Sequence, residues 1–155
     1  MVYEDGLGWP DSDSYATAKM AKTYFDSINF DYSSYKDAEI EAALIRATAY
    51  IDTYKRWPGR KENEEQGLEW PRTDAYDVNG YLLSGVPAPI RKATMEAAKL
   101  ELVEPGYLAT YSKMAVTREK VGDIEVQYSG ADEKLKAVTQ YLKKVVSIGG
   151  VRLER

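Results

Sequence analysis

The sequence contains no cysteine and no histidine among its 155 residues. Without cysteine the chain can form no disulfide, no thiolate nucleophile and no thiolate metal site. Without histidine it lacks the commonest general acid or base, the commonest zinc ligand and the side chain that usually titrates near neutral pH. Catalysis would have to rest on carboxylates, lysine or tyrosine, and no spacing in the sequence suggests a paired site. We therefore expect no catalytic residues, no metal and no cofactor.

Long apolar runs and an excess of positive charge are also missing. No apolar run approaches the roughly 18 residues that a membrane-spanning helix needs, and residues 1–6 lack the basic and apolar regions of a signal peptide. We expect synthesis in the cytoplasm and no membrane partner. The 21 Lys and Arg stand against 25 Asp and Glu, which gives a net charge of −4. That balance argues against a protein whose main task is to bind phosphate backbones.

What the chain does contain is helical periodicity. Apolar residues recur at helical spacing in four segments, 12–28, 37–56, 87–104 and 132–148. Ser12 or Ser14, Asp37 and Asp132 stand where helix N-caps belong. Alanine-rich stripes on the second and third segments predict close packing between those two helices. The fold class we predict is mainly α, with a four-helix core, a long ordered loop and a small β-hairpin.

The hairpin is expected at residues 115–128, where the apolar period changes to two. Ile124, Val126 and Tyr128 alternate along it and form one apolar face. An isolated two-stranded ribbon is marginally stable, so this face should lie on the helices or extend a neighbour's sheet. Gly149-Gly150 ends the last helix. We therefore divide the chain into a single domain, 1–148, and a C-terminal arm, 149–155, which either frays or pairs with a partner's strand.

Residues 57–86 form the longest segment without periodicity, and two Trp-Pro pairs bracket the charged loop in its first half. A residue before proline is pushed toward an extended conformation, so each pair should end regular structure and hold a large aromatic side chain at a fixed angle. The sequences are Trp57-Pro58-Gly59 and Trp70-Pro71-Arg72. Either the tryptophans hold the loop against the helical core, because tryptophan is highly buried on average, or they lie at a subunit interface. Both alternatives remain open at this point.

From Ile40 to Leu100 the sequence resembles the head–tail connector, or adaptor, proteins of tailed bacteriophages. The resemblance rests on Ala42-Ala43-Leu44-Ile45-Arg46-Ala47-Thr48, Trp57-Pro58-Gly59-Arg60, Trp70-Pro71-Arg72-Thr73 and Val86-Pro87 with the alanine-rich segment after it. Some relatives carry the label DnaT-like single-stranded DNA-binding protein. Gly67 departs from the pattern, since relatives more often have a helix-favouring residue there.

The resemblance implies a structural virion protein located at the neck between capsid and tail. Such a protein joins the portal to the tail as a homo-oligomeric ring of about twelve subunits, built from head-to-tail interfaces. DNA would pass through the ring without tight binding. The implied docking residues are the Trp-Pro loop, the hairpin and the arm. In the arm they are Ile148, Val151, Arg152, Leu153 and Arg155.

Two other functions remain as alternatives. A single-stranded DNA-binding accessory protein of replication would need a basic groove lined by aromatic side chains, and the composition supplies the aromatics, with 13 Tyr and 3 Trp, but not the overall charge. An enzyme is the least favoured alternative, because it would need a carboxylate pair that the sequence does not indicate.

Overall fold

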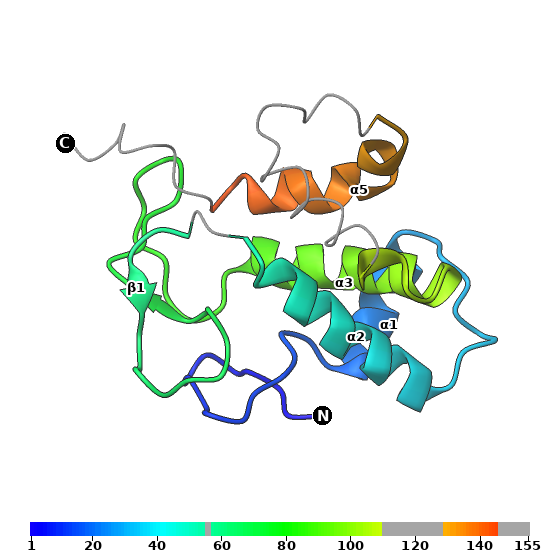
Figure 1. The fold of residues 1–155 in the computed structure, drawn as a ribbon, viewed down its shortest axis with the longest axis horizontal. Coiled ribbons are helices and arrows are strands. Elements are labelled where there is room, and N and C mark those ends of the chain that lie inside the picture. The colour runs from blue at the N-terminus through cyan, green and yellow to red at the C-terminus, as the bar shows by residue number, and fades with distance from the viewer. Residues whose placement is uncertain (55–56, 110–128, 146–155) are drawn as a thin grey trace.

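The computed structural model describes residues 1–54, 57–109 and 129–145. Within these ranges the protein is mainly α-helical, which confirms the predicted fold class. Helix α3 (Ala88–Val103) forms the middle layer, with α5 (Ser129–Leu142) on one side and α2 (Asp37–Ile51) on the other. Helix α1 (Ala18–Ser27) lies behind α2 in the view of Figure 1. None of the helices in these ranges has the length and apolar character that crossing a bilayer requires.

The N-caps differ from those expected. Thr17, not Ser12 or Ser14, caps α1, and its hydroxyl accepts the N–H of Met20 at 3.1 Å. The Ser12 hydroxyl instead donates to the buried Glu4 carboxylate at 2.7 Å. At α2 the cap is Lys36, one residue before the expected Asp37, and its N–H donates to the Glu39 carboxylate at 3.0 Å.

Helix α2 ends earlier than the sequence predicts, at Ile51 and not at Trp57. The Thr53 hydroxyl and N–H both donate to the carbonyl of Tyr50, at 2.6 and 3.0 Å, and this tight turn stops the helix. Asp52, the first residue after α2, still donates its N–H to the Thr48 carbonyl at 3.0 Å, while its carboxylate binds the loop and the N-terminal segment. The turn at Thr53 therefore ends the helix, and Asp52 links that end to two segments distant in sequence.

Helix α3 is buried on two flanks, as its middle position requires. Its alanines Ala93, Ala97 and Ala98 are all buried, which allows the close packing with α2 that the sequence predicts. Helix α5 presents an apolar face to α3 through Leu135, Val138 and Leu142. This helix begins at Ser129, so the expected cap, Asp132, lies inside it.

The loop after α2 contains a short antiparallel pair, β1 (Arg60–Lys61) and β2 (Arg72–Thr73), with Arg60 opposite Thr73. The N-terminal segment packs beside this loop, and the N–H of Gly67 donates to the carbonyl of Trp9 at 3.0 Å. A β-carbon on Gly67 would stand 2.6 Å from the Pro10 carbonyl oxygen. The glycine that departs from the family pattern is therefore what lets the two segments approach.

Several sequence-based expectations fall outside the described residues. They are the hairpin at 115–128 with Ile124, Val126 and Tyr128, and the arm with Ile148, Val151, Arg152, Leu153 and Arg155. The β-strand pair that the structure does describe lies in the long loop and is a different element.

Candidate functional site

The two Trp-Pro pairs of the long loop, Trp57-Pro58 and Trp70-Pro71, come together in space. Trp70 is completely buried, and Trp57, which is half-buried, packs edge-on against it with ring centroids 5.7 Å apart. The Tyr54 ring lies 5.8 Å from Trp57 on the other side. Pro58 and Pro71 are buried as well. The geometry therefore places Trp70 in the core, while contact of these residues with another subunit stays a prediction.

Arg72 links the two ends of this loop. Its guanidinium donates to the carbonyls of Pro58 and Gly59, at 2.6 and 3.0 Å, and to the carboxylate of Glu69 at 2.9 Å. The Gly59 backbone has φ of +66°, and a β-carbon there would collide with the Thr73 carbonyl oxygen. Arg72 is thus engaged within the loop, so its role in this structure is to fix the shape of the loop.

A buried polar network connects the N-terminal segment, α2 and the loop. The hydroxyl of Tyr15 donates to the Asp52 carboxylate at 2.6 Å and accepts the N–H of Trp70 at 3.1 Å. The second oxygen of Asp52 accepts the N–H of Glu69 at 3.1 Å. Burial raises the pKa of Asp52 from its usual 3.8 to about 6, against the opposing effect of these hydrogen bonds. Burial and the nearby Asp52 charge also raise the pKa of Tyr15.

The raised pKa of Asp52 makes stability depend on pH. Since the folded-state pKa lies above the unfolded value, the folded protein binds the extra proton between about pH 4 and pH 6, and stability falls as pH rises through this window. We expect the free energy of unfolding to fall by about 2 kcal/mol relative to an Asp52→Asn variant between pH 4 and pH 7. Urea denaturation of both proteins at the two pH values measures the difference, and a constant difference would contradict the assignment.

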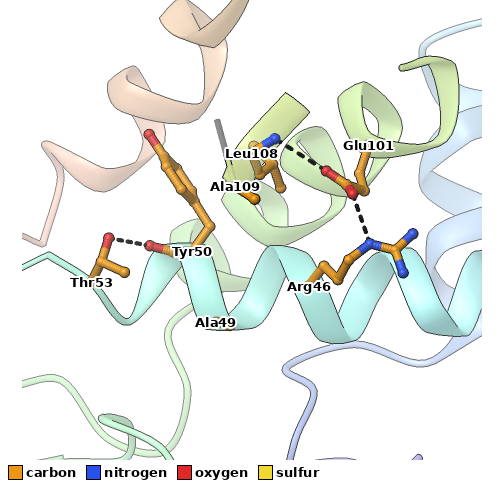
Figure 2. Close-up of a pocket in the computed structure, with 7 residues that line it drawn as sticks. All are labelled: Arg46, Ala49, Tyr50, Thr53, Glu101, Leu108 and Ala109. Carbon is orange, nitrogen blue, oxygen red and sulfur yellow. Dashed lines mark hydrogen bonds and ion pairs between the residues drawn. The ribbon is translucent and has the colours of Figure 1, made fainter. Parts of the chain in front are cut away.

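A cavity of about 220 Å³ opens between α2 and the turn after α3 (Figure 2). The charged groups that line the cavity are already paired with each other. The buried carboxylate of Glu101 accepts Arg46 Nε at 2.7 Å and the N–H groups of Gly106 and Leu108 at 2.8 and 3.2 Å. The remaining lining is supplied mainly by Ala49, Tyr50, Thr53 and Ala109. Glu101 therefore holds the turn after α3 in place, and we assign this cavity a structural role.

A group of exposed lysines lies on α5 and just after it. Lys136 on the helix, and Lys143 and Lys144 in the turn that follows it, are exposed, whereas the side that packs on α3 is apolar; we call these three residues the lysine face. Among the described residues, no carboxylate lies within ion-pairing distance of their ammonium groups. The Lys144 ammonium lies 5.8 Å from the centre of the Tyr141 ring. The lysine face is therefore positively charged and adjoins an aromatic ring.

This asymmetry was present in the sequence but not in our predicted site. Residues 134–155 contain six Lys or Arg and one acidic residue, while residues 1–133 contain 15 basic and 24 acidic residues. The net charges of the two parts are therefore +5 and −9. A net charge counted over the whole chain conceals this difference, whereas a count by segment would have indicated a basic C-terminal part.

Comparison with known protein families gives a match over the whole sequence. A family model described as "Putative DnaT-like ssDNA binding protein" covers residues 1–155. No curated protein and no solved structure is significantly similar to the chain.

This match corrects the phage interpretation of the sequence. The expected description as a bacteriophage virion component, a head–tail connector in a dodecameric ring at the portal, is wrong on this comparison, because the matching family is described by single-stranded DNA binding. The DnaT-like label that some relatives carry is the part of the resemblance that the comparison confirms.

Proposed function

The chain belongs to the family of DnaT-like ssDNA-binding proteins, whose model matches it from residue 1 to residue 155, and we propose that it binds single-stranded DNA through the lysine face of α5. The proposal is one of binding without a catalytic step. The observation that carries it is the separation of charge, with +5 after residue 133 and −9 before it.

A protein of net charge −4 is expected to repel DNA overall. Here, however, the positive charge is concentrated in one part of the sequence. Affinity for a phosphate backbone depends on locally concentrated lysine and arginine, which displace condensed counterions. The three residues of the lysine face are exposed on α5 and the turn after it, and α5 packs on α3 as an outer layer of the molecule (Figure 1). An acidic remainder would also limit contact with the strand to this side of the molecule.

The lysines also affect the stability of α5, and the experiment has to distinguish this effect from DNA binding. Positive charge near the C-terminal end of a helix stabilises it through the helix dipole, by about 0.3–1 kcal/mol per charge. Lys143 and Lys144 follow directly after Leu142, the last residue of α5. Replacing the lysines is therefore expected to lower stability slightly whether or not they bind DNA.

The test is a fluorescence anisotropy titration of a labelled 20-nucleotide poly(dT) strand. We expect the wild-type protein to bind at low salt, with affinity that falls as salt rises. In the triple variant Lys136→Gln/Lys143→Gln/Lys144→Gln, binding at 50 mM salt should weaken about 10- to 100-fold. The slope of log affinity against log salt concentration should decrease by about 2, since each phosphate contact with a single strand contributes about 0.7.

The matched control removes three exposed positive charges elsewhere, in Lys19→Gln/Lys36→Gln/Arg60→Gln. It should keep wild-type affinity and salt slope. Equal loss in both triple variants would mean that only overall charge matters, and the lysine face would be rejected. If the wild-type protein fails to bind the strand even at low salt, single-stranded DNA binding itself is rejected.

A further inference from the structure

The loop before α3 carries a second exposed feature, a small hairpin at residues 75–83 that we call the tyrosine hairpin. Tyr76 and Leu82 form an antiparallel bridge, and the N–H of Leu83 donates to the carbonyl of Ala75 at 2.7 Å. At its tip, Gly80 takes φ of +89°, which suits glycine. In Figure 1 the loop containing the hairpin projects on the side toward which the C-terminal end of α5 points.

The backbone of the tyrosine hairpin is held firmly by Asp77. Its carboxylate accepts the N–H groups of Asn79 and Tyr81 at 2.8 and 3.0 Å. Its own N–H donates to the Tyr81 carbonyl at 2.9 Å. Tyr81 is thus fixed at both backbone groups, so its ring projects from an ordered position. Little conformational freedom would be lost when a ligand binds there.

The large apolar side chains of this hairpin are exposed to solvent. Tyr81 is 72% exposed and Leu82 63%, with Val78 and Tyr76 at 47% and 42%. Four large apolar side chains exposed within seven residues are unusual for a folded surface, where such residues occur singly. An ordered, exposed apolar patch of this kind marks a surface that binds something.

From this arrangement we propose that the tyrosine hairpin stacks against the bases of single-stranded DNA, with Tyr81 as the principal platform. This inference rests on the proposed function. Proteins that bind single strands combine a positively charged track for the backbone with aromatic rings for the bases, and the lysine face supplies only the first. The Asp77 charge near the tip disfavours phosphate there but does not oppose stacking, because the ring meets the flat face of a base. A protein partner is the competing occupant.

Three substitutions of Tyr81 separate stacking from general apolar contact. In Tyr81→Ala the affinity for the labelled poly(dT) strand should fall about fivefold to a hundredfold, since stacking on an aromatic ring contributes strongly for each base. Tyr81→Leu should lose as much, because it keeps an apolar side chain but no ring. Tyr81→Trp should bind at least as well as wild type. The salt slope should stay unchanged in all three, since no phosphate contact is removed.

The control is Val103→Ala, which shortens a side chain that is 62% exposed on α3 and should leave affinity unchanged. Circular dichroism melting checks that each variant is folded. If Tyr81→Ala and Tyr81→Leu bind like wild type while the lysine triple variant binds weakly, the hairpin is not a stacking platform, although the proposed function stands. If Tyr81→Leu binds like wild type while Tyr81→Ala binds weakly, Tyr81 makes a general apolar contact with the strand and does not stack on a base. Absence of wild-type binding overturns both proposals.

Discussion

Replacing Trp70 by alanine should lower the free energy of unfolding by about 3–5 kcal/mol. Trp70 is completely buried, and its ring supports Trp57 at 5.7 Å. Removing it leaves a large cavity where the loop, α2 and the N-terminal segment meet, and the cost includes both lost burial and unfilled volume. Since a domain of this size is stable by only about 5–15 kcal/mol, the variant should unfold at much lower urea concentration.

The sequence offers a matched control for this substitution. Trp9 is 46% exposed, and its indole N–H bonds to the exposed Asp5 at 3.0 Å. Trp9→Ala therefore removes the same side chain without opening a core cavity, and we expect a loss below about 1 kcal/mol. Trp70→Phe should fall between the two, because the Trp70 indole N–H has no acceptor among the described residues and no hydrogen bond is lost. Equal losses in Trp70→Ala and Trp9→Ala would contradict the burial of Trp70.

Glu4→Ala should cost a comparable amount, about 3–5 kcal/mol, from lost hydrogen bonds and not from lost volume. One carboxylate oxygen of this fully buried side chain accepts the N–H groups of Gly6 and Gly8 at 2.9 and 2.7 Å. The other accepts the N–H of Trp9 at 3.1 Å and the Ser12 hydroxyl at 2.7 Å. Alanine leaves these donors without an acceptor, and each buried unsatisfied group costs about 1–3 kcal/mol.

Two further variants test this explanation. Glu4→Gln keeps the shape of the side chain but places an amide NH₂ against backbone donors, so its loss should be smaller than that of alanine but still clear. Asp5→Ala removes a neighbouring exposed carboxylate whose bonds water can replace, and it should change the urea midpoint little. Hydrogen exchange of residues 6–12 should rise in Glu4→Ala alone. Protection equal to that of wild type would show that the carboxylate does not organise this segment.

Local patterns in the sequence predicted α2 and α3 well. Their apolar residues follow one helical face, and buried alanines such as Ala43 and Ala97 allow the two helices to pack closely. The Trp-Pro pairs correctly marked an ordered loop, because proline restricts the residue before it wherever it occurs. Each of these features depends on residues only a few positions apart.

The ends of the helices and the buried carboxylates could not be predicted in the same way. Asp52 was expected inside a helix, yet its partners are Tyr15 and the backbone of Glu69, residues from two other segments. Glu101 lies on an apolar helix face and looks unsuited to burial until Arg46 is brought beside it. Whether an acidic residue is buried depends on donors that only the folded chain assembles.

The candidate site likewise has one feature that the sequence alone indicates and one that depends on the folded structure. The basic character of the segment after residue 133 could be read from the sequence alone. The exposure of Tyr81 could not be read from the sequence, because the sequence contains 13 tyrosines and does not show which of them the folded chain buries. Tyr15 and Tyr81 are the extremes, one completely buried and the other 72% exposed.

The position of the N-terminal segment has a consequence for the order in which the protein acquires its structure during translation. Residues 1–16 are synthesised before their partners, since Trp9 is bound by Gly67, Tyr15 by Asp52, and the carbonyls of Glu4 and Tyr15 by Arg91. The final contacts of this segment therefore form only after Arg91 has been synthesised.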